Sequence, residues 1–210
     1  MIKILIIDDH AIVRRGLKQI ISETADMLSV DEACNGPEAL AKLSQYHYDV
    51  VLLDISLPGG SGLDILRRIK SKKPKLPVLM LSVHSEEQYA VRSLKAGASG
   101  YLTKESAPDE LIAAVKKISR GGKYVSSSVA EKLVSELEPS DTKPCHESLS
   151  DREFEVMHMF ASGKTLKEIA EELSLSIQTI STYRTRILDK MKMNSIADVI
   201  RYAVKQGLVE

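Results

Sequence analysis

Three acidic residues stand directly after apolar runs of the sequence. Asp8 and Asp9 follow the run at 2–7, and Asp54 follows the run at 50–53. Runs of this kind are typical of parallel strands covered on both faces, and neighbouring strands of a doubly wound sheet open onto one crevice. Two carboxylates about 4 Å apart repel by roughly 4 kcal/mol at an effective dielectric constant of about 20. A hard cation relieves that repulsion, so the sequence predicts a Mg²⁺ site on these three side chains.

Two further polar side chains are expected at the same edge of the sheet. Ser82 follows the apolar run at 78–81, and Lys104 comes shortly after the run at 100–102. A hydroxyl, an ammonium and a metal ion around Asp54 suit phosphoryl transfer, because the carboxylate is a nucleophile and the cations neutralise the phosphoryl oxygens. A helix N-cap in a solvated loop explains the acidic pair alone equally well, and a surface lysine explains Lys104 alone. Their combination favours phosphoryl transfer.

The elements that must position these side chains alternate along residues 1–122. The expected strands are 2–7, 28–33, 50–53, 78–81 and 100–102. The expected helices are 12–21, 37–43, 63–70, 86–96 and one that follows Pro108. Strict alternation predicts an α/β domain with a doubly wound five-stranded parallel sheet, whose site lies at the carboxyl ends of the strands.

The rest of the chain is expected to be helical. A stretch at 128–137 and a run of turn formers at 138–144 indicate a helix followed by a linker. Within 148–210, capping signals and apolar stripes at helical spacing predict four short helices that form a smaller all-α domain. The domains are therefore predicted at 1–122, 123–147 (helix and linker) and 148–210.

The helical domain carries the signature of a helix-turn-helix. Residues 174–176 alone separate its second and third helices, and a turn of this length is what the motif requires. The apolar stripe of the third helix includes Ile177 and is expected to face the core, which leaves small hydrogen-bonding side chains on the outer face. We expect that face to enter the major groove of double-stranded DNA, with base contacts from Ser181, Thr182 and Thr185.

Phosphate contacts are expected around this third helix, because basic residues outnumber acidic ones between 176 and 192. The side chains assigned to these contacts are Lys164, Thr165, Gln178, Thr179, Tyr183, Arg186 and Lys190. The alternative is that this is the solvated polar face of a domain that binds protein.

Composition excludes several classes of protein. Hydrophobic residues make up 43% of the chain and charged residues 28%, which is typical of a globular protein and excludes a disordered or fibrous one. No apolar run reaches the ~18 residues of a membrane span and the start lacks the pattern of a signal peptide, so we expect a cytoplasmic protein with no membrane partner. Cys34 and Cys145 show no zinc spacing and are predicted to be free thiols.

Residues 1–120 resemble the receiver domain of bacterial two-component response regulators, which has a flavodoxin-like fold. The resemblance depends on Asp8, Asp9, Asp54, Gly62, Ser82, Tyr101 and Lys104, in the family's order. It implies that a sensor histidine kinase donates a phosphoryl group to Asp54. It also implies that Ser82 and Tyr101 report the phosphorylation by moving together.

The same resemblance assigns the metal ligands. Mg²⁺ is expected on Asp9, Asp54 and the carbonyl of Ser56, with Asp8 in support. Glu105 stands where many members of the family have a proline that shapes the loop after the lysine. The geometry of this loop is therefore left open.

Residues 148–210 resemble the LuxR-type helix-turn-helix of the NarL/FixJ group of regulators. The matching segments are 149–153, 161–170, 179–183 and 190–191. Together the two resemblances imply a transcription regulator that forms a homodimer when phosphorylated or DNA-bound, and that catalyses only its own phosphoryl transfer and dephosphorylation. Ser181 and Tyr183 stand where many members carry lysine and histidine, so the target sequence is expected to differ from theirs.

Two other functions fit parts of this pattern. A Mg²⁺-dependent phosphatase would also use Asp54 as its nucleophile, but it needs a second acid two residues later, where this sequence has Ser56. Steady turnover of a phosphate ester would favour it. A phosphorylation-switched adaptor would bind protein through its helical domain, and a co-purifying partner without retardation of DNA would favour that function.

Overall fold

The computed structural model describes residues 2–23, 27–58, 60–83, 86–135 and 144–209. The chain divides into two compact units, 1–138 and 139–210. All but the last residue of the expected linker, 138–144, lies outside the described residues. Among the described residues, none of the helices is both long and apolar enough to cross a membrane.

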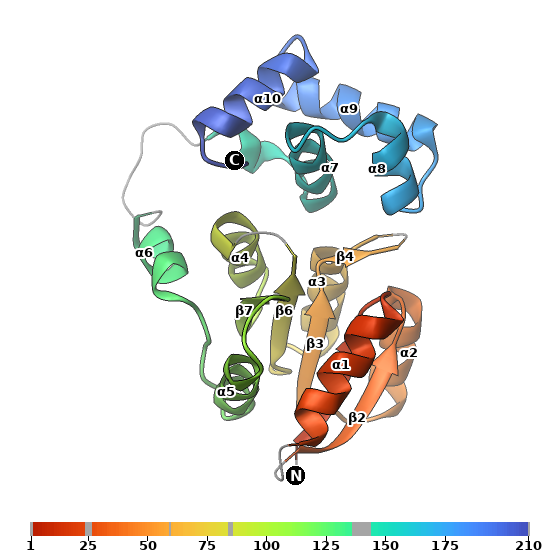
Figure 1. Ribbon diagram of the computed structural model, residues 1–210, viewed down its shortest axis with the longest axis vertical. Helices are drawn as coiled ribbons and strands as arrows, with labels where there is room; N and C mark the ends of the chain where they lie inside the picture. Colours follow the sequence, from red (N-terminus) through yellow and green to blue (C-terminus); the bar gives the residue numbers. More distant parts are fainter. Residues whose placement is uncertain (1, 24–26, 59, 84–85, 136–143, 210) are drawn as a thin grey trace. The chain divides into compact units, whose positions relative to one another are not determined.

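The first unit is built on a parallel sheet of five strands (Figure 1). These are β1 (Ile2–Ile7), β2 (Met27–Ala33), β3 (Val50–Asp54), β6 (Val78–Ser82) and β7 (Gly100–Thr103). Their order is β2-β1-β3-β6-β7, which confirms the predicted doubly wound sheet. Because the strand order reverses between β1 and β3, the carboxyl ends of these two strands flank the crevice of the sheet.

Helices cover both faces of this sheet. They are α1 (Ala11–Ser22), α2 (Gly36–Gln45), α3 (Gly62–Lys72), α4 (Glu86–Lys95) and α5 (Pro108–Ser119). A further helix, α6 (Ser127–Ser135), lies against α4 and not against the sheet (Figure 1). One buried cluster joins β1, β3, β6 and β7 to α1 and α5, with Ile4, Leu52 and Val115 among its members. Burying several such side chains at ~1.5–3 kcal/mol each supplies much of the drive to fold.

A short antiparallel hairpin interrupts the predicted alternation. Strands β4 (Ser56–Leu57) and β5 (Gly60–Ser61) pair with each other between β3 and α3. Strands of two residues are too short to show any hydrophobic period, so sequence reasoning missed them. The hairpin matters because Ser56, a predicted metal ligand, belongs to it.

The segment after α5 completes the edge of the sheet. The carbonyl of Tyr124 accepts from the N–H of Tyr101 at 3.3 Å, and the N–H of Tyr124 donates to the carbonyl of Ser99 at 2.9 Å. Gly100 permits this approach, since a Cβ there would lie 2.6 Å from the Tyr124 oxygen. Helix α6 then packs on α4 and buries Val129. Helix α6 therefore lies within the first unit.

The second unit is all helical, as predicted. It contains a 3₁₀ turn, η1 (Cys145–Ser148), and then α7 (Asp151–Ala161), α8 (Leu166–Glu172), α9 (Ile177–Met191) and α10 (Ile196–Lys205). The capping boxes begin α7 and α8 as expected, with Ser150 and Thr165 accepting from the N–H groups of Glu153 and Glu168. The cysteines are free thiols, as predicted.

One predicted core residue of this unit is wrong. Ile177 was expected in the buried stripe of the third helix, but 54% of its surface is exposed. At about 100° per residue it lies roughly 60° around α9 from Ile180, which is fully buried. Ile177 therefore lies at the margin of the stripe, where the rest of the unit does not cover it.

Candidate functional site

The structure brings together the acids and the lysine that the sequence singled out. Lys104 Nζ lies 2.7 Å from Asp54 Oδ2, to which it donates a hydrogen bond, and 2.7 Å from Asp8 Oδ2. The second contact is an ion pair. The side chains of Asp8 and Asp54 are 1% and 2% exposed, so this is a buried charge cluster.

Strand pairing explains the convergence. Ile7 of β1 pairs with Leu53 of β3, so the residues that follow them, Asp8 and Asp54, emerge side by side. On the other side of β3, the N–H of Lys104 donates to the carbonyl of Ser82 at 2.7 Å. The sheet register therefore places residues that are far apart in sequence at one edge.

Gly62 allows α3 to begin against the end of β3. Its N–H donates to the carbonyl of Ile55 at 2.7 Å. A Cβ on Gly62 would lie 2.0 Å from the backbone oxygen of Asp54, which no side chain tolerates. Glycine at this position is therefore required to hold the hairpin and α3 close to the aspartate.

Burial and charge set the protonation of the cluster. Burial raises the pKa of Asp54 to about 6, the ammonium of Lys104 opposes this, and the charge of Asp8 adds to it. For Lys104, burial alone would lower the pKa, but the charges of Asp54 and Asp8 outweigh it and the pKa is raised. Lys104 is therefore a permanent cation, whereas Asp54 takes up its proton not far below neutral pH.

The acidic residues form a pocket suited to a cation. Ligand atoms of Asp8, Asp9, His10 and Asp54 all lie within 4.8 Å of one another. Three carboxylates fit Mg²⁺, which prefers oxygen ligands. Ser56 lies against the same site, where its N–H donates to the Asp54 carboxylate. These residues can hold a magnesium ion.

Sequence reasoning missed His10. Its ring nitrogen Nδ1 lies 2.8 Å from Asp9 Oδ1 and 3.3 Å from Asp8 Oδ1. Spacing gave no signal, because a single histidine beside two acids matches no metal motif. The position of His10 directly after the acidic pair was the one available hint.

The two predicted switch residues are buried in neighbouring strands of the sheet. Ser82 ends β6 and Tyr101 lies in β7, and both are almost fully buried. Tyr101 thus already occupies the interior in this structure. Its proposed movement together with Ser82 stays a prediction.

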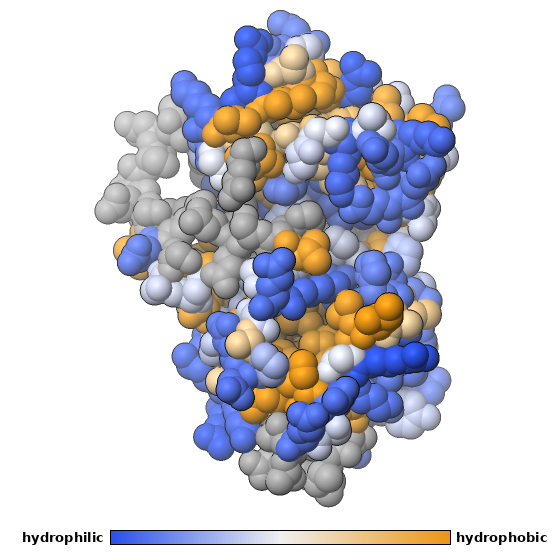
Figure 2. Space-filling model, viewed as in Figure 1, coloured by the Kyte–Doolittle hydropathy of each residue, from blue (hydrophilic) through white to orange (hydrophobic). Residues whose placement is uncertain are grey.

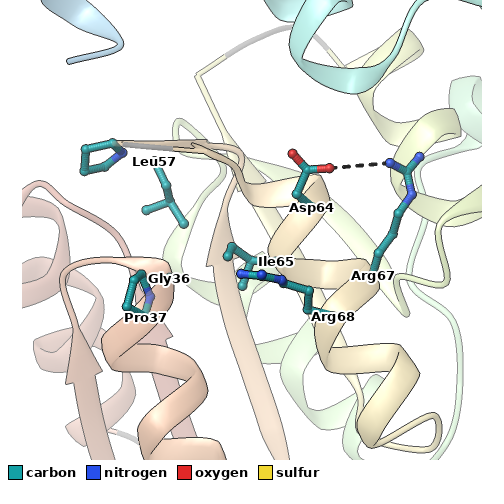
Figure 3. A pocket seen from close by; sticks show the side chains of 8 residues that line it. Gly36, Pro37, Leu57, Asp64, Ile65, Arg67 and Arg68 are labelled. Atoms are coloured by element: carbon teal, nitrogen blue, oxygen red, sulfur yellow. Dashed lines mark ion pairs between the residues drawn. The ribbon is translucent and has the colours of Figure 1, made fainter. Parts of the chain in front are cut away.

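A cavity of about 520 Å³ lies beside the hairpin (Figure 3). Gly36 and Pro37 at the start of α2, Leu57 and residues of α3 line it, and the side chain of Arg68 extends along it. None of the acidic cluster lines this cavity. The candidate metal site is therefore a separate feature.

Comparison with known proteins agrees with this geometry. Residues 4–116 match the response regulator receiver domain, and residues 147–203 match the luxR family of bacterial regulatory proteins. This chain is a two-component response regulator of the NarL/FixJ type. The predicted family is thereby confirmed.

Similarity extends over the full length of characterised regulators. The chain is 35% identical over 209 residues to the response regulator UvrY of Escherichia coli K12, covering 99% of this chain and 96% of UvrY. It is 35% identical over 215 residues to the oxygen regulatory protein NreC of Staphylococcus carnosus, covering 99% of each. A structure of the response regulator RcsB in complex with DNA is 26% identical, with a TM-score of 0.59 over 97% of this chain and 98% of that one.

In this response regulator, α9 presents the residues predicted to contact bases. Ser181, Thr182 and Thr185 are exposed on one side of the helix. The hydroxyl of Thr182 donates to the carbonyl of Gln178 at 3.0 Å, and that of Thr185 donates to the carbonyl of Ser181 at 3.2 Å. Their protons are therefore used within the helix, which the sequence did not reveal.

Several predicted phosphate contacts already have partners in the regulator. Lys190 pairs with Glu153 at 2.6 Å, and Lys164 pairs with Glu172. Burial alone would raise the pKa of Glu153, but hydrogen bonds from Lys190 and from Ser150 outweigh it, so that the pKa is lowered. Two hydroxyls are also engaged: Thr165 caps α8, and Thr179 bonds to Ser176.

The remaining phosphate candidates are less engaged. Gln178 and Arg186 are exposed and Tyr183 is partly buried. Within the described part of the chain, the guanidinium of Arg186 forms no ion pair. Arg186 is thus a cation available for a phosphate contact, and the DNA roles of all these residues stay predictions.

Proposed function

We propose that this response regulator accepts a phosphoryl group on Asp54 from a sensor histidine kinase, and that phosphorylation switches its dimerisation and its binding to DNA. The observation that supports this most strongly is the buried contact of Lys104 with Asp54 and Asp8, at 2.7 Å each. A lysine and a second carboxylate around one aspartate are the groups that phosphoryl transfer to a carboxylate requires. A DNA-binding role also supports a cytoplasmic location.

The chain's own residues carry out the transfer. A carboxylate oxygen of Asp54 forms a bond to phosphorus as the bond from phosphorus to the kinase's histidine nitrogen breaks, which leaves an acyl phosphate and a neutral histidine. With a pKa of about 6, Asp54 is mostly ionised and nucleophilic above pH 7. The ammonium of Lys104, which pairs with the Asp54 carboxylate before transfer, then stabilises the negative charge of the new phosphoryl oxygens.

Magnesium would complete this site. Asp8, Asp9, Asp54 and the carbonyl of Ser56 would hold it, since their oxygens suit a hard cation. When bound, Mg²⁺ neutralises charge on the transferring phosphoryl group. Asp8 and Asp9 act by binding the metal and take no part in bond formation.

The regulator catalyses only its own phosphorylation and dephosphorylation. A phosphatase of this design carries a second acid two residues after the nucleophile, and Ser56 stands there. A hydroxyl at that place cannot protonate a leaving alkoxide at neutral pH as a carboxylic acid does. We therefore do not expect turnover of phosphate esters.

The C-terminal unit supplies the output by binding double-stranded DNA through α9. The RcsB complex shows that a regulator of this architecture binds DNA. A homodimer is supported by α10, where Figure 2 shows a band of hydrophobic surface and where Val204 is 54% exposed. Two copies joined in this way would place two reading helices on successive half-sites.

The test is incorporation of phosphate from an acyl-phosphate donor with Mg²⁺. The wild type should be labelled and Asp54→Asn should not, since an amide is no nucleophile for this transfer. Asp64→Asn is the matched control, because Asp64 is an exposed acid at the start of α3 outside the cluster. Equal labelling of Asp54→Asn and the wild type would show that the acceptor has been misassigned.

A further inference from the structure

Ile177 presents an apolar side chain on the helix that faces DNA. It is the first residue of α9, and 54% of its surface is exposed. Among the described residues of the C-terminal unit, one other large apolar side chain is as exposed, Val204 on α10. In helix-turn-helix domains the N-terminal residues of the reading helix contact base edges. Ile177 therefore stands where a base would meet it.

The neighbours of Ile177 lie on the same side of α9. Ser181 is four residues further on, so the two side chains follow one another along one stripe of the helix. Gln178 is next to it in sequence and exposed. Side chains also lean towards the N-terminus of a helix, which brings this group to the end of α9.

The threonines of this face have little hydrogen-bond donor capacity left. Thr182 and Thr185 donate their hydroxyl protons to carbonyls one turn back, at 3.0 and 3.2 Å. Each threonine then offers DNA its methyl group and the acceptor side of its hydroxyl. The reading face thus combines an isoleucine, two threonine methyls and the amide of Gln178, and it is poor in charge at its N-terminal end.

We propose that α9 reads A·T pairs, with Ile177 packed against the 5-methyl group of a thymine. The thymine methyl is the apolar group that base pairs present in the major groove, and the amide of Gln178 matches the donor and acceptor of adenine. This proposal therefore moves Gln178 from the predicted phosphate contacts to the base contacts. A guanine would instead call for Arg or Lys, and neither stands at 177, 178, 181 or 182. This inference rests on the proposed function, in that the C-terminal unit binds duplex DNA through α9.

The test removes the methyl from the DNA. Duplexes are selected from a random-sequence pool by the full-length wild type with beryllium trifluoride and Mg²⁺, and each thymidine of the selected site is then replaced by deoxyuridine. One replacement should weaken wild-type binding about fourfold, which corresponds to roughly 0.8 kcal/mol for one buried methyl-sized group. Ile177→Ser should bind more weakly and be indifferent to that same replacement.

Val204→Ser is the matched control, because Val204 is equally exposed but lies on α10. It should keep the wild type's sensitivity to that uracil, whatever its overall affinity. The replacement of each thymidine by deoxyuridine tests the wild type alone, so this part of the experiment does not depend on whether a variant folds. Circular dichroism checks that Ile177→Ser is folded.

The outcomes separate the two claims. A G·C-rich selected site, or the same uracil penalty in Ile177→Ser as in the wild type, overturns the reading of thymine while DNA binding stands. Failure of the wild type to select any duplex overturns the proposed DNA function, and this inference with it.

Discussion

The acidic site and the reading face of α9 are built in opposite ways. In the acidic site, the contact between Lys104 and Asp54 joins residues 50 positions apart in the chain, and both carboxylates are buried. On α9, the hydroxyls of Thr182 and Thr185 reach carbonyls only four residues back. The first arrangement exists only once the sheet has formed, whereas the second exists as soon as the helix does.

The two regions also differ in their electrostatics. Asp54 is held in a buried site that raises its pKa, so its charge works against folding. The exposed side chains of α9 remain solvated and carry no such cost. The acidic site thus gains a reactive carboxylate and loses folding stability. The reading face shows neither of these effects.

The largest expected effect comes from crowding the acidic site. In Gly62→Ala the new Cβ would lie 2.0 Å from the Asp54 backbone oxygen, so α3 must shift. We expect the free energy of unfolding to fall by at least about 3 kcal/mol. Denaturation in urea, followed by circular dichroism, measures it.

Gly16→Ala is the matched control for this substitution. Gly16 lies within α1, and a Cβ there would meet nothing within 4 Å. This variant should be stabilised by about 0.5–1 kcal/mol, since alanine is the better helix former. If both variants moved the urea midpoint alike, the close approach at Gly62 would not be limiting.

The next largest effect is expected from Asp54→Asn, which should remove reactivity and raise the free energy of unfolding. Its pKa is about 6 in the folded state against 3.8 when unperturbed, so the folded state binds the proton more tightly. The stability it contributes is present below pH 3.8 and is lost as the pH rises through about 6, a cost of order 3 kcal/mol at neutral pH. Asp54→Asn should therefore unfold at higher urea than the wild type at pH 7.5 without Mg²⁺.

The pH dependence of that difference checks its cause. The advantage of Asp54→Asn should shrink as the pH falls from 7 towards 4, and Mg²⁺ should stabilise the wild type more than the variant. A difference that stays constant over this range would mean that the raised pKa is not its source.

A smaller effect is expected on the reading face. Arg186→Ala removes an exposed guanidinium, and we expect the affinity for duplex DNA to fall about tenfold and the slope of its salt dependence to become shallower by about 1. Fluorescence anisotropy at several salt concentrations measures both. Arg201→Ala on α10, where the arginine pairs with Asp198, should leave the slope unchanged. If the affinity of the wild type for duplex DNA did not change with salt concentration, contacts between the protein and DNA phosphates would be excluded.

The smallest effect is expected at Thr182. Thr182→Val keeps the methyl group and replaces a hydroxyl that bonds only within the helix by a second methyl. Stability should change by less than about 0.5 kcal/mol and DNA affinity by less than about twofold. A tenfold loss of affinity would show that the hydroxyl itself reaches a base.

Much of this protein could be predicted from local pattern. Apolar runs and helical stripes predicted the five main strands and the helices between them, and the capping boxes at Ser150 and Thr165 predicted where α7 and α8 begin. The acids could be located because each directly follows a strand. These signals are readable because each depends on residues only a few positions apart.

Only the tertiary structure decided which side chains contact one another and which apolar side chains are left exposed. It placed His10 on the acidic pair, laid Tyr124 along the edge of β7 and paired Lys190 with Glu153. It also left Ile177 exposed at the margin of a buried stripe. The partners and the burial of these side chains depend on elements that meet only when the chain is folded. The two strands of the hairpin, each two residues long, are also too short to show a hydrophobic period in the sequence.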